Sequence, residues 1–455
     1  MATGVSRTQR NKNLPAIALP SMPEGTDIML SYAGKREERD ILHTPPTVTR
    51  NIWSGNIDTD GKASNYLCYG DNLPILAAML HNPSIRRQVR LVYIDPPYAT
   101  RSIFQSREQE TSYEDLLEGA HYVEFMRERL ILLRELLAED GSIYVHLDKN
   151  MAFHIKLVMD EVFDARNFRS LITRRKCNPK NYTRRTYGNV SDYILFYTKS
   201  DDYVWHRPVE GWSAEGIAKE YQYVEKDGRR YKKVPIHAPG VRNGASGQPW
   251  RGMNPPPGKH WQYVPSTLEE MDARGEIYWS PNGNPRRKVY LDDSDGVPVQ
   301  DIWLDYPDAH NQNIEITGYP TEKNPALLAR IINASSNPSD LVLDCFSGSG
   351  TTLAVASQLG RRWVGIDSSS QAIIATLRRF SNGLERMGDF VSPKKEAGNG
   401  KQAQASLTLP LFDVLPPEVS AASSQPVITD FVLLAEQSSD AQKLEQILQC
   451  VPALG

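Results

Sequence analysis

Apolar residues follow two periods along the chain, and together these predict alternating strands and helices. Short apolar runs bounded by turn residues occur at 91–94, 142–147 and 193–198, as expected for strands buried in a parallel sheet. Apolar residues at helical spacing occupy the segments between them, at 115–137 and 151–163. The order strand, helix, strand predicts an α/β fold.

This regular pattern stops near residue 200. The stretch 201–310 is rich in Pro and Gly, lacks long periodic segments and holds six of the eight tryptophans. The α/β pattern then resumes, with helices and strands expected at 325–334, 341–346, 351–359, 362–367 and from Gln371. We therefore predict a sheet divided by an inserted smaller domain, with most of the tryptophans of that insertion in a core.

The length of 455 residues also favours two structural units, because single cores stop growing at roughly 250 to 300 residues. The first 50 residues are polar and broken by prolines, and the chain becomes rich in Ala, Gln, Ser and Pro from about Ser392, before a helical pattern at 440–450. The predicted layout is an arm at 1–50, a first α/β half at 51–200, the insertion at 201–310, a second α/β half at 311–390, and a flexible or partner-docking tail at 391–455.

Composition narrows the classes only a little. The net charge of −3 says nothing about nucleic acid, whereas the distribution of charge does. The four cysteines form no CxxC pair, so we predict neither a metal site nor a disulfide framework, and a reducing compartment. No apolar run reaches membrane-spanning length and the N-terminus lacks the apolar core of a secretory signal, which predicts a cytoplasmic protein.

The sequence Asp95-Pro96-Pro97-Tyr98 directly follows the apolar run 91–94, and residues at the carboxyl ends of such strands often carry function. Two prolines fix the backbone and remove amide donors, so the Asp95 carboxylate and the Pro96 carbonyl become preset acceptors. Two acceptors can draw the exocyclic amine of a base toward tetrahedral geometry, and Tyr98 offers a face for stacking. Such a base must leave the duplex. A simple turn is the alternative, since Asp and Pro both favour turns.

A second motif, at 342–352, is an apolar strand that enters a Gly-rich turn and opens a helix, which brings backbone amides close to a cofactor. Leu353 stands where a dinucleotide motif needs its third glycine, and no Gly-Lys-Ser/Thr follows, so NAD and ATP are disfavoured. The next strand ends at Asp367, at a spacing suited to ribose hydroxyls. Asp71 and Asn72 either contact a cofactor ring or begin a helix.

Taken in order, these motifs resemble β-class amino DNA methyltransferases, related to type II and type III modification enzymes. The resemblance rests on Gly-Asp-Asn-Leu at 70–73, Asp-Pro-Pro-Tyr at 95–98, an insertion, Tyr-Pro-Thr-Glu-Lys-Asn-Pro at 319–325 and Asp-x-Phe-x-Gly-Ser-Gly at 344–350. It covers roughly 51–386. It implies a Rossmann-like S-adenosylmethionine-dependent methyltransferase fold with a mostly parallel sheet, in which the insertion is a target-recognition domain.

The resemblance also implies a set of site residues. The catalytic ones are Asp95, Pro96, Pro97 and Tyr98. The cofactor-binding ones are Asp71, Asn72, Asp344, Phe346, Gly348, Ser349, Gly350, Thr351, Asp367, Thr321 and Lys323. The family often has Lys-Pro where this chain has Lys323-Asn324-Pro325.

The implied reaction is transfer of methyl from S-adenosylmethionine to the N6 amine of a flipped-out adenine in double-stranded DNA, in a restriction-modification system or alone. Transfer to cytosine N4 in the same pocket stays open. So does a different class, a DNA-binding regulatory subunit that has lost the chemistry. Further candidate partners are a second copy and a restriction subunit, and the expected location is the prokaryotic cytoplasm, associated with the nucleoid.

The stretch 166–185 carries eight basic and no acidic residues, interleaved with Asn and Tyr. A run of this kind is either a solvated face or a phosphate-binding surface. We predict phosphate contacts, made by Arg174, Arg175, Lys176, Lys180, Arg184 and Arg185. His146 and Asp148, at the end of another strand, resemble an acid/base pair, but a structural role fits better because methyl transfer needs little general-base help.

Overall fold

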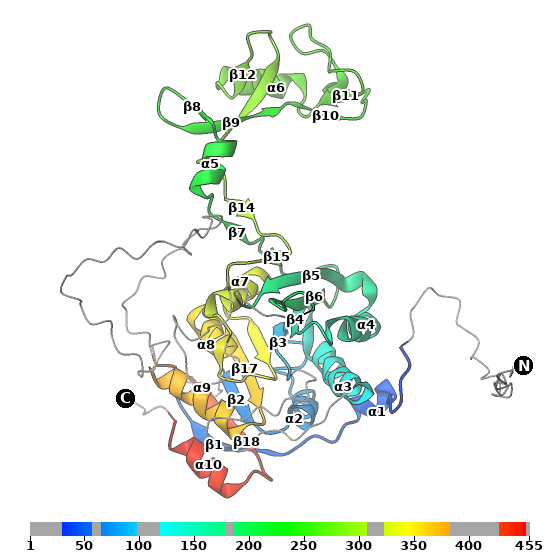
Figure 1. Cartoon of the computed structure of the whole chain (residues 1–455), viewed down its shortest axis with the longest axis vertical. Coiled ribbons are helices and arrows are strands. Elements are labelled where there is room, and N and C mark those ends of the chain that lie inside the picture. Colours follow the sequence, from blue (N-terminus) through cyan, green and yellow to red (C-terminus); the bar gives the residue numbers. More distant parts are fainter. Residues whose placement is uncertain are drawn as a thin grey trace, which may run out of the picture.

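A ten-stranded mixed sheet forms the centre of the protein (Figure 1). The computed structural model describes residues 30–56, 65–97, 119–177, 185–306, 323–382 and 427–451. Across the sheet, the strands are β1 (Thr49–Ser54), β18 (Phe431–Glu436), β2 (Asn65–Tyr69), β17 (Arg362–Asp367), β16 (Leu341–Asp344), β3 (Val89–Ile94), β4 (Leu137–Leu147), β6 (Ser191–Thr198), β5 (Phe168–Arg175) and β15 (Ile302–Trp303).

The sheet is mostly parallel, as predicted. The six strands from β18 to β4 run parallel, and so do β5 and β15. β6 is antiparallel to both β4 and β5, so the prediction of a parallel strand at 193–198 is wrong in direction. Its apolar composition indicated burial, which both directions provide. The carboxyl ends of the parallel strands therefore meet at one edge of the sheet.

Helices cover both faces of this sheet. Helices on one face contribute to a core with β3 and β4: α1 (Glu38–Leu42), α2 (Asn72–Met79), α3 (Ala120–Leu136) and α4 (Ala152–Phe163). Helices on the other face form a second core: α7 (Pro325–Ser335), α8 (Thr351–Gln358), α9 (Ser370–Asn382) and α10 (Ala441–Leu448). A short 3-10 turn, η1 (Ala165–Asn167), leads from α4 into β5. Among the described helices, none combines the length and apolar character needed to cross a membrane.

The insertion projects from the central domain on a narrow connection (Figure 1). The connection consists of the paired strands β7 (Val209–Glu210) and β14 (Val297–Pro298), followed by α5 (Ala214–Glu220). Beyond it lie a four-stranded sheet, a two-stranded sheet and two short helices: β8 (Tyr223–Val224), β9 (Arg230–Pro235), β10 (His237–Pro239), η2 (Ala245–Gly247), β11 (Lys259–Trp261), α6 (Pro265–Ala273), β12 (Ile277–Trp279) and β13 (Pro285–Tyr290). The chain then returns to the main sheet at β15.

The tryptophans of the insertion divide between several environments. Trp250 and Trp261 are buried in a small separate core with Leu268 and Met271. Trp303 is buried in the main core instead, and the side chain of Trp205 is 45% exposed. The insertion thus has a hydrophobic core of its own, but not every tryptophan of this stretch serves it.

The C-terminal stretch is part of the fold rather than a loose tail over residues 427–451. β18 lies between β1 and β2, and Phe431 and Leu433 are fully buried there. Asp440 then caps α10 by accepting the amide of Lys443 at 3.0 Å. The predicted arm at 1–50 likewise contributes α1 and the start of β1.

Candidate active site

Three neighbouring parallel strands, β3, β16 and β17, end side by side at the carboxyl edge of the sheet, and an aspartate stands at the end of each. The register pairs Val92 of β3 with Leu343 of β16, so Asp95 and Asp344 follow neighbouring positions on adjacent strands. Adjacent strands lie about 4.8 Å apart. Asp367 ends β17, the next strand along. The fold therefore brings together the two predicted motifs, which are separated by about 250 residues of sequence.

The Asp-Pro-Pro corner lies at this edge. The Asp95 side chain is 17% exposed, Pro96 is buried and Pro97 is exposed. The Lys323 ammonium lies 2.7 Å from the Asp95 carboxylate. Lys323, predicted to bind the cofactor, thus contacts the first residue of the catalytic motif. Tyr98 and Thr321 lie outside the described residues.

The Gly-rich loop after β16 is held by α9. Gly350 has φ +72°, and a Cβ there would meet the Thr376 side chain at 2.6 Å, so glycine is required. The Thr376 hydroxyl donates to the Gly348 carbonyl at 3.0 Å, and the Arg379 guanidinium donates to the Ser349 carbonyl at 2.7 Å. Sequence reasoning missed Thr376 and Arg379, because α9 carries no motif beyond its apolar spacing.

Asp367 ties this loop to the end of β17. Its carboxylate accepts the Gly348 amide at 2.8 Å and the Ser369 amide at 2.9 Å. Partial burial raises the pKa of Asp367 although these amides oppose the shift. The predicted ribose ligand thus also fixes the backbone of the predicted methionine-binding loop.

Asp344 is the most buried carboxyl group of the site. It accepts the Thr352 hydroxyl at 2.7 Å and the Phe346 amide at 3.0 Å. Burial, with smaller contributions from the charges of Asp95 and Asp367, raises its pKa to about 7, although the two hydrogen bonds oppose the shift. A positive charge nearby would stabilise the ionised form of this buried carboxyl group. Thr351, also predicted here, is buried at the start of α8.

Asp71 and Asn72 stand at the start of α2, which is one of the two roles that the sequence left open. The Asp71 carboxylate accepts the Leu73 amide at 3.0 Å and so caps α2. The Asn72 side chain donates to the Cys345 carbonyl at 2.7 Å, which connects this turn to the strand end beside the Gly-rich loop. Arg129 donates to the Asn72 side chain at 2.5 Å and to the Asp71 carboxylate at 3.1 Å.

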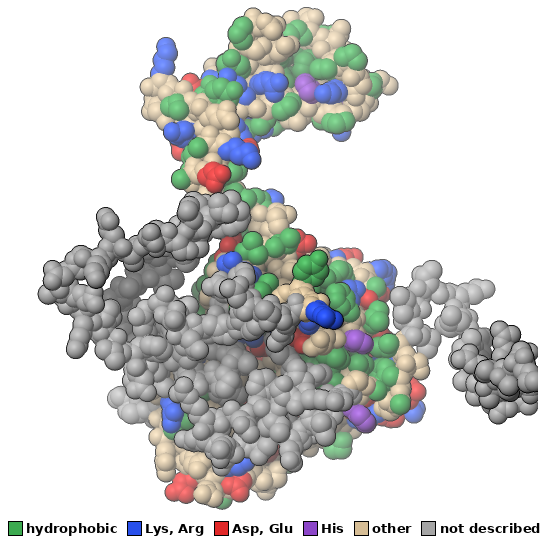
Figure 2. Space-filling view, viewed as in Figure 1, with side chains coloured by type: hydrophobic (Ala, Val, Ile, Leu, Met, Phe, Trp, Pro, Cys, Tyr) green, Lys and Arg blue, Asp and Glu red, His purple; other side chains and the backbone are tan. Residues whose placement is uncertain are grey.

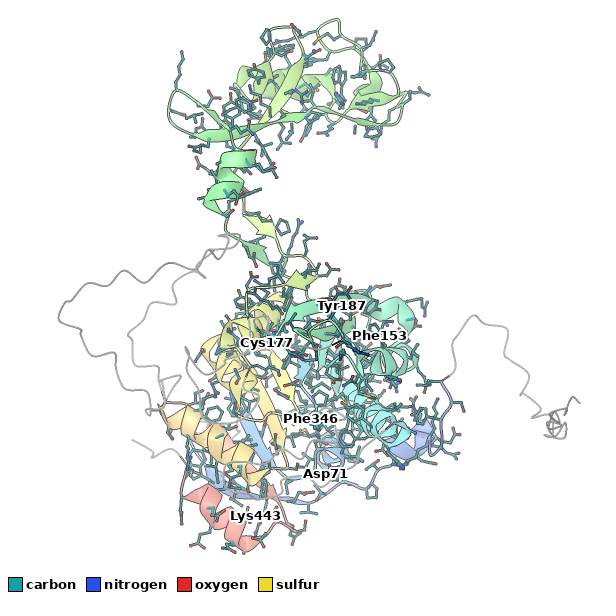
Figure 3. All side chains as sticks on the ribbon, in the orientation of Figure 1. Asp71, Phe153, Cys177, Tyr187, Phe346 and Lys443 are labelled. Atoms are coloured by element: carbon teal, nitrogen blue, oxygen red, sulfur yellow. The ribbon has the colours of Figure 1, made fainter. Side chains whose placement is uncertain are left out.

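Two aromatic rings continue this contact toward the loop. The Arg129 guanidinium lies 3.5 Å from the centre of the Phe125 ring, and that ring lies 6.0 Å from Phe346. Asp71 and Phe346 accordingly occupy the same part of the central domain in Figure 3. Phe125 and Arg129 of α3 were not predicted, because their sequence pattern indicates only an amphipathic helix.

The added strand β18 also reaches the site. The Glu436 carboxylate accepts the Asp71 amide at 3.1 Å. Gly70 has φ +154°, and a Cβ there would lie 2.4 Å from the Glu436 side chain. Glycine at this position therefore allows the strand end to approach. No motif marks Glu436, so only the fold identifies it.

His146 and Asp148 have separate structural contacts. His146 is fully buried, and its Nδ1 lies 2.9 Å from the Tyr93 hydroxyl. Burial lowers its pKa, and the charge of Lys323 adds to this effect. The Asp148 carboxylate accepts the amides of Asn150 and Met151, each at 3.1 Å, where the chain turns into α4. These contacts support the structural role predicted for both residues.

The basic run divides into buried, paired and exposed residues. Arg174 is fully buried and donates to the Tyr306 carbonyl at 2.8 Å, which contradicts the prediction that it contacts phosphates. Lys176 pairs with Asp192 at 2.8 Å and keeps partial exposure. Arg175 is half-buried and Arg185 is exposed. Lys180 and Arg184 lie outside the described residues.

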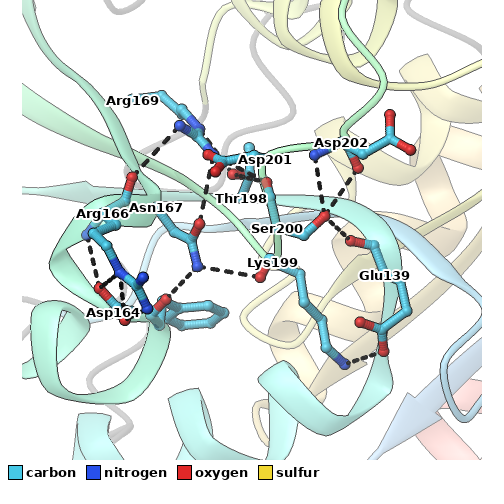
Figure 4. A network of polar contacts seen from close by, with 11 residues as sticks. Glu139, Asp164, Arg166, Asn167, Arg169, Thr198, Lys199, Ser200, Asp201 and Asp202 are labelled. Carbon is cyan, nitrogen blue, oxygen red and sulfur yellow. Dashed lines mark hydrogen bonds and ion pairs between the residues drawn. The ribbon is translucent and has the colours of Figure 1, made fainter.

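The first two arginines of that run pair with carboxylates that lie outside the run (Figure 4). Arg166 pairs with Asp164 at 2.7 Å, and Arg169 pairs with Asp201 at 2.7 Å. Each of these two arginines therefore already has a carboxylate partner within the protein. On the face of the inserted domain seen in Figure 2, Lys and Arg side chains lie scattered among hydrophobic ones.

The residues at this edge suit S-adenosylmethionine. The Ser347 hydroxyl is buried in the Gly-rich loop and has no hydrogen-bond partner within the described part of the chain. Asp344, Asp367 and the loop backbone offer acceptors and amides around it. Among the described residues, no group of three or more His, Cys, Asp or Glu could hold a metal ion.

Comparison with known proteins agrees with this geometry. The N6 and N4 methyltransferase family model, described as "DNA methylase", matches residues 89–377, which is more than half of the chain. The type II methyltransferase M.EcaI of Enterobacter cloacae is 46% identical over 396 residues, which cover 86% of this chain and 85% of that protein.

More distant similarities extend to other modification enzymes. The Mod subunit of the type III restriction-modification enzyme StyLTI of Salmonella typhimurium is 28% identical over 371 residues, which cover 72% of this chain and 54% of that protein. The crystal structure of the M1.HpyAVI–SAM complex aligns at 17% identity and a TM-score of 0.38, covering 69% of this chain and 98% of that one. The chain thus belongs to the N6 and N4 DNA methylase family, has the Rossmann-like methyltransferase fold and uses S-adenosylmethionine as its methyl donor.

Proposed function

We propose that this protein methylates the N6 amine of an adenine that has been rotated out of duplex DNA. The observation that carries this proposal is the position of Asp95 at the end of β3, next to the Gly-rich loop that follows β16. The Asp-initial form of the motif favours adenine over cytosine. The type II and type III relatives support a role in restriction-modification.

The amine is activated by two acceptors. Its lone pair is delocalised into the base, so the nitrogen is a weak nucleophile until its two N–H groups are held out of the ring plane. The Asp95 carboxylate and the Pro96 carbonyl accept these N–H groups, and the two prolines keep both acceptors in place. Tyr98 stacks on the base in this proposal.

The donor is bound on the neighbouring strands. S-adenosylmethionine supplies a methyl group made electrophilic by the positive sulfur that carries it. The Gly348–Gly350 loop binds its methionine end, Asp367 binds the ribose hydroxyls, and Asp71 and Asn72 border the adenine. Asp344 stabilises the positive charge from its buried position. Most of the rate enhancement comes from holding the two substrates in line.

Duplex DNA approaches along the carboxyl edge. β5 ends there at Arg175, and the segment that precedes β6 presents Arg185 and the fully exposed Tyr187. Phe153, at the start of α4, is 57% exposed on the same side, and Figure 3 labels both aromatic residues. Basic side chains can bind phosphates and aromatic rings can stack on bases, so their occurrence together supports a nucleic-acid-binding surface here.

Product analysis tests the proposal. Duplex DNA is incubated with the protein and S-adenosylmethionine carrying a deuterated methyl group, then digested to nucleosides for mass spectrometry. N6-methyl-2′-deoxyadenosine is expected from the wild type and should be absent with Asp95→Ala. Detection of N4-methyl-2′-deoxycytidine would overturn the choice of adenine. If no duplex tested became methylated, the alternative of a DNA-binding regulatory subunit would be favoured.

A further inference from the structure

The proposed activation of the amine uses Asp95 and Pro96 but assigns no role to Lys323, which forms an ion pair with Asp95. The Lys323 ammonium lies 2.7 Å from Asp95 Oδ2, and the two side chains are only 8% and 17% exposed. Exposed ion pairs contribute little to stability, but a pair shielded from water fixes both side chains, since breaking it leaves a charge poorly solvated. This contact therefore constrains the carboxylate that meets the substrate amine.

The fold presents Lys323 from a rigid position. It directly precedes Asn324, whose side-chain oxygen accepts the Ala326 amide at 2.9 Å and caps α7. Pro325 occupies the first turn of that helix, and the buried Leu328 anchors it in the core. The ammonium is thus presented from the residue next to an anchored helix start.

Three carboxyl groups lie close together at this edge, so a positive charge beside them reduces their mutual repulsion. Asp344 and Asp367 end the next two strands, and the charges of Asp95 and Asp367 both act to raise the pKa of Asp344. Lys323 also acts on His146, where its positive charge adds to burial in lowering the pKa. The ammonium therefore lies among the charged groups of the site and influences more than one of them.

We propose that Lys323 is a positioning residue for methyl transfer, which holds the Asp95 carboxylate in the orientation that accepts the amine N–H. The inference rests on the proposed role of Asp95. The ammonium keeps the carboxylate in one rotamer before the base arrives, so the base meets a preset acceptor and little reorganisation remains. Lys323 is then not a cofactor ligand, which is the role that the family resemblance implied.

Variants of Lys323 separate these roles. Lys323→Met removes the charge and keeps the length of the side chain, and Lys323→Arg keeps a cation. Lys443→Met, at an exposed position on α10, controls for loss of a lysine elsewhere. Single-turnover methyl transfer on duplex DNA is measured at saturating cofactor, with the Kd of S-adenosylmethionine measured by calorimetry and the Tm as a check of folding.

Lys323→Met should slow the transfer step about a hundredfold, the cost of a misplaced reacting group, with a cofactor Kd within about threefold of wild type. Lys323→Arg should recover most of the rate, and Lys443→Met should match the wild type. An unchanged rate in Lys323→Met overturns the inference. So does a weakened cofactor Kd with a normal rate at saturation, because that result makes Lys323 a cofactor ligand.

Asp95→Asn distinguishes failure of the inference from failure of the proposed function. If Asp95→Asn is inactive while Lys323→Met is fully active, only the inference fails. If Asp95→Asn transfers methyl at the wild-type rate, the proposed function fails first. Should Lys323→Met have a Tm far below that of the wild type, Lys323→Leu, which also removes the charge and the hydrogen-bond donor, is measured in its place against the same criteria.

Discussion

The carboxyl edge of the central sheet and the inserted domain use polar side chains in different ways. At the edge, Asp344 and Asp367 accept backbone amides of the loops beside them. In the insertion, Arg251 is 42% exposed and bridges the side chains of Glu269 and Asp272. The edge thus holds its carboxylates against backbone amides, whereas Arg251 of the insertion forms ion pairs at the surface.

This difference predicts that substitutions at the edge alter cofactor binding or the transfer step, and that substitutions in the insertion alter DNA affinity. The predictions below test that division, beginning with the largest expected effect.

Asp367→Ala should weaken S-adenosylmethionine binding about thirtyfold or more, because it removes the ribose acceptor and releases the amides of Gly348 and Ser369. Calorimetry measures the Kd. Asp340→Ala is the matched control, since Asp340 accepts the Asn337 amide near the opposite edge of the sheet. An unchanged Kd in Asp367→Ala, or an equal loss of affinity in Asp340→Ala, would contradict the proposal that the cofactor binds at the carboxyl edge.

Glu436→Ala should weaken cofactor binding about fivefold, because the Asp71 amide loses its charged acceptor at 3.1 Å. Glu436→Gln keeps an oxygen for that amide and should stay within about twofold of wild type. The same calorimetric titration reports both. Equal Kd values for Glu436→Ala and wild type would mean that β18 supports the sheet without shaping the cofactor site.

On the insertion, Lys233→Ala should lower DNA affinity about threefold and reduce the slope of log K against log salt by about one. The Lys233 ammonium lies 3.5 Å from the ring centre of Tyr223 and 3.3 Å from that of Tyr278, on one face of the small sheet. Fluorescence anisotropy over a salt series measures both quantities, with Lys443→Ala as control. A slower transfer step at saturating DNA would break the division between the two regions.

The smallest expected effect concerns stability and pH. Burial raises the pKa of Asp344 from 3.8 to about 7, so between these values the folded protein holds a proton that the unfolded chain releases. Folding therefore loses stability as the pH rises through that window. In the cofactor-free protein, Asp344→Asn should reduce the fall in Tm between about pH 5 and pH 8 by roughly 2 °C. An identical fall in both proteins would show that Asp344 ionises normally.

Contiguous motifs explain what could be predicted from the sequence. Asp95, Asp344 and Asp367 each follow an apolar strand, and parallel strands bring their ends together, so pattern alone placed them at one edge. The layout of sheet, insertion and second half followed from the same periodicity. The short strand β18 was missed because its apolar run stands alone within a stretch of tail-like composition.

Contacts between distant segments explain what was missed. The partners of Lys323 and Arg129 lie far away in the sequence, at Asp95 and at Asp71, and no local pattern encodes such pairs. The sequence predicts that Arg174 contacts phosphates, because a run of basic residues usually lies at the surface. In the fold it alternates into the interior of β5 and donates to a carbonyl.

The central claim is that the Asp95 carboxylate activates the amine, and Asp95→Asn tests it most directly because the side chain keeps its size while losing its charge. The rate of methyl transfer in a single turnover is measured at saturating S-adenosylmethionine and duplex DNA. We predict a rate about a thousandfold below wild type, with the Kd of each substrate within about threefold. A rate close to that of the wild type would contradict the account.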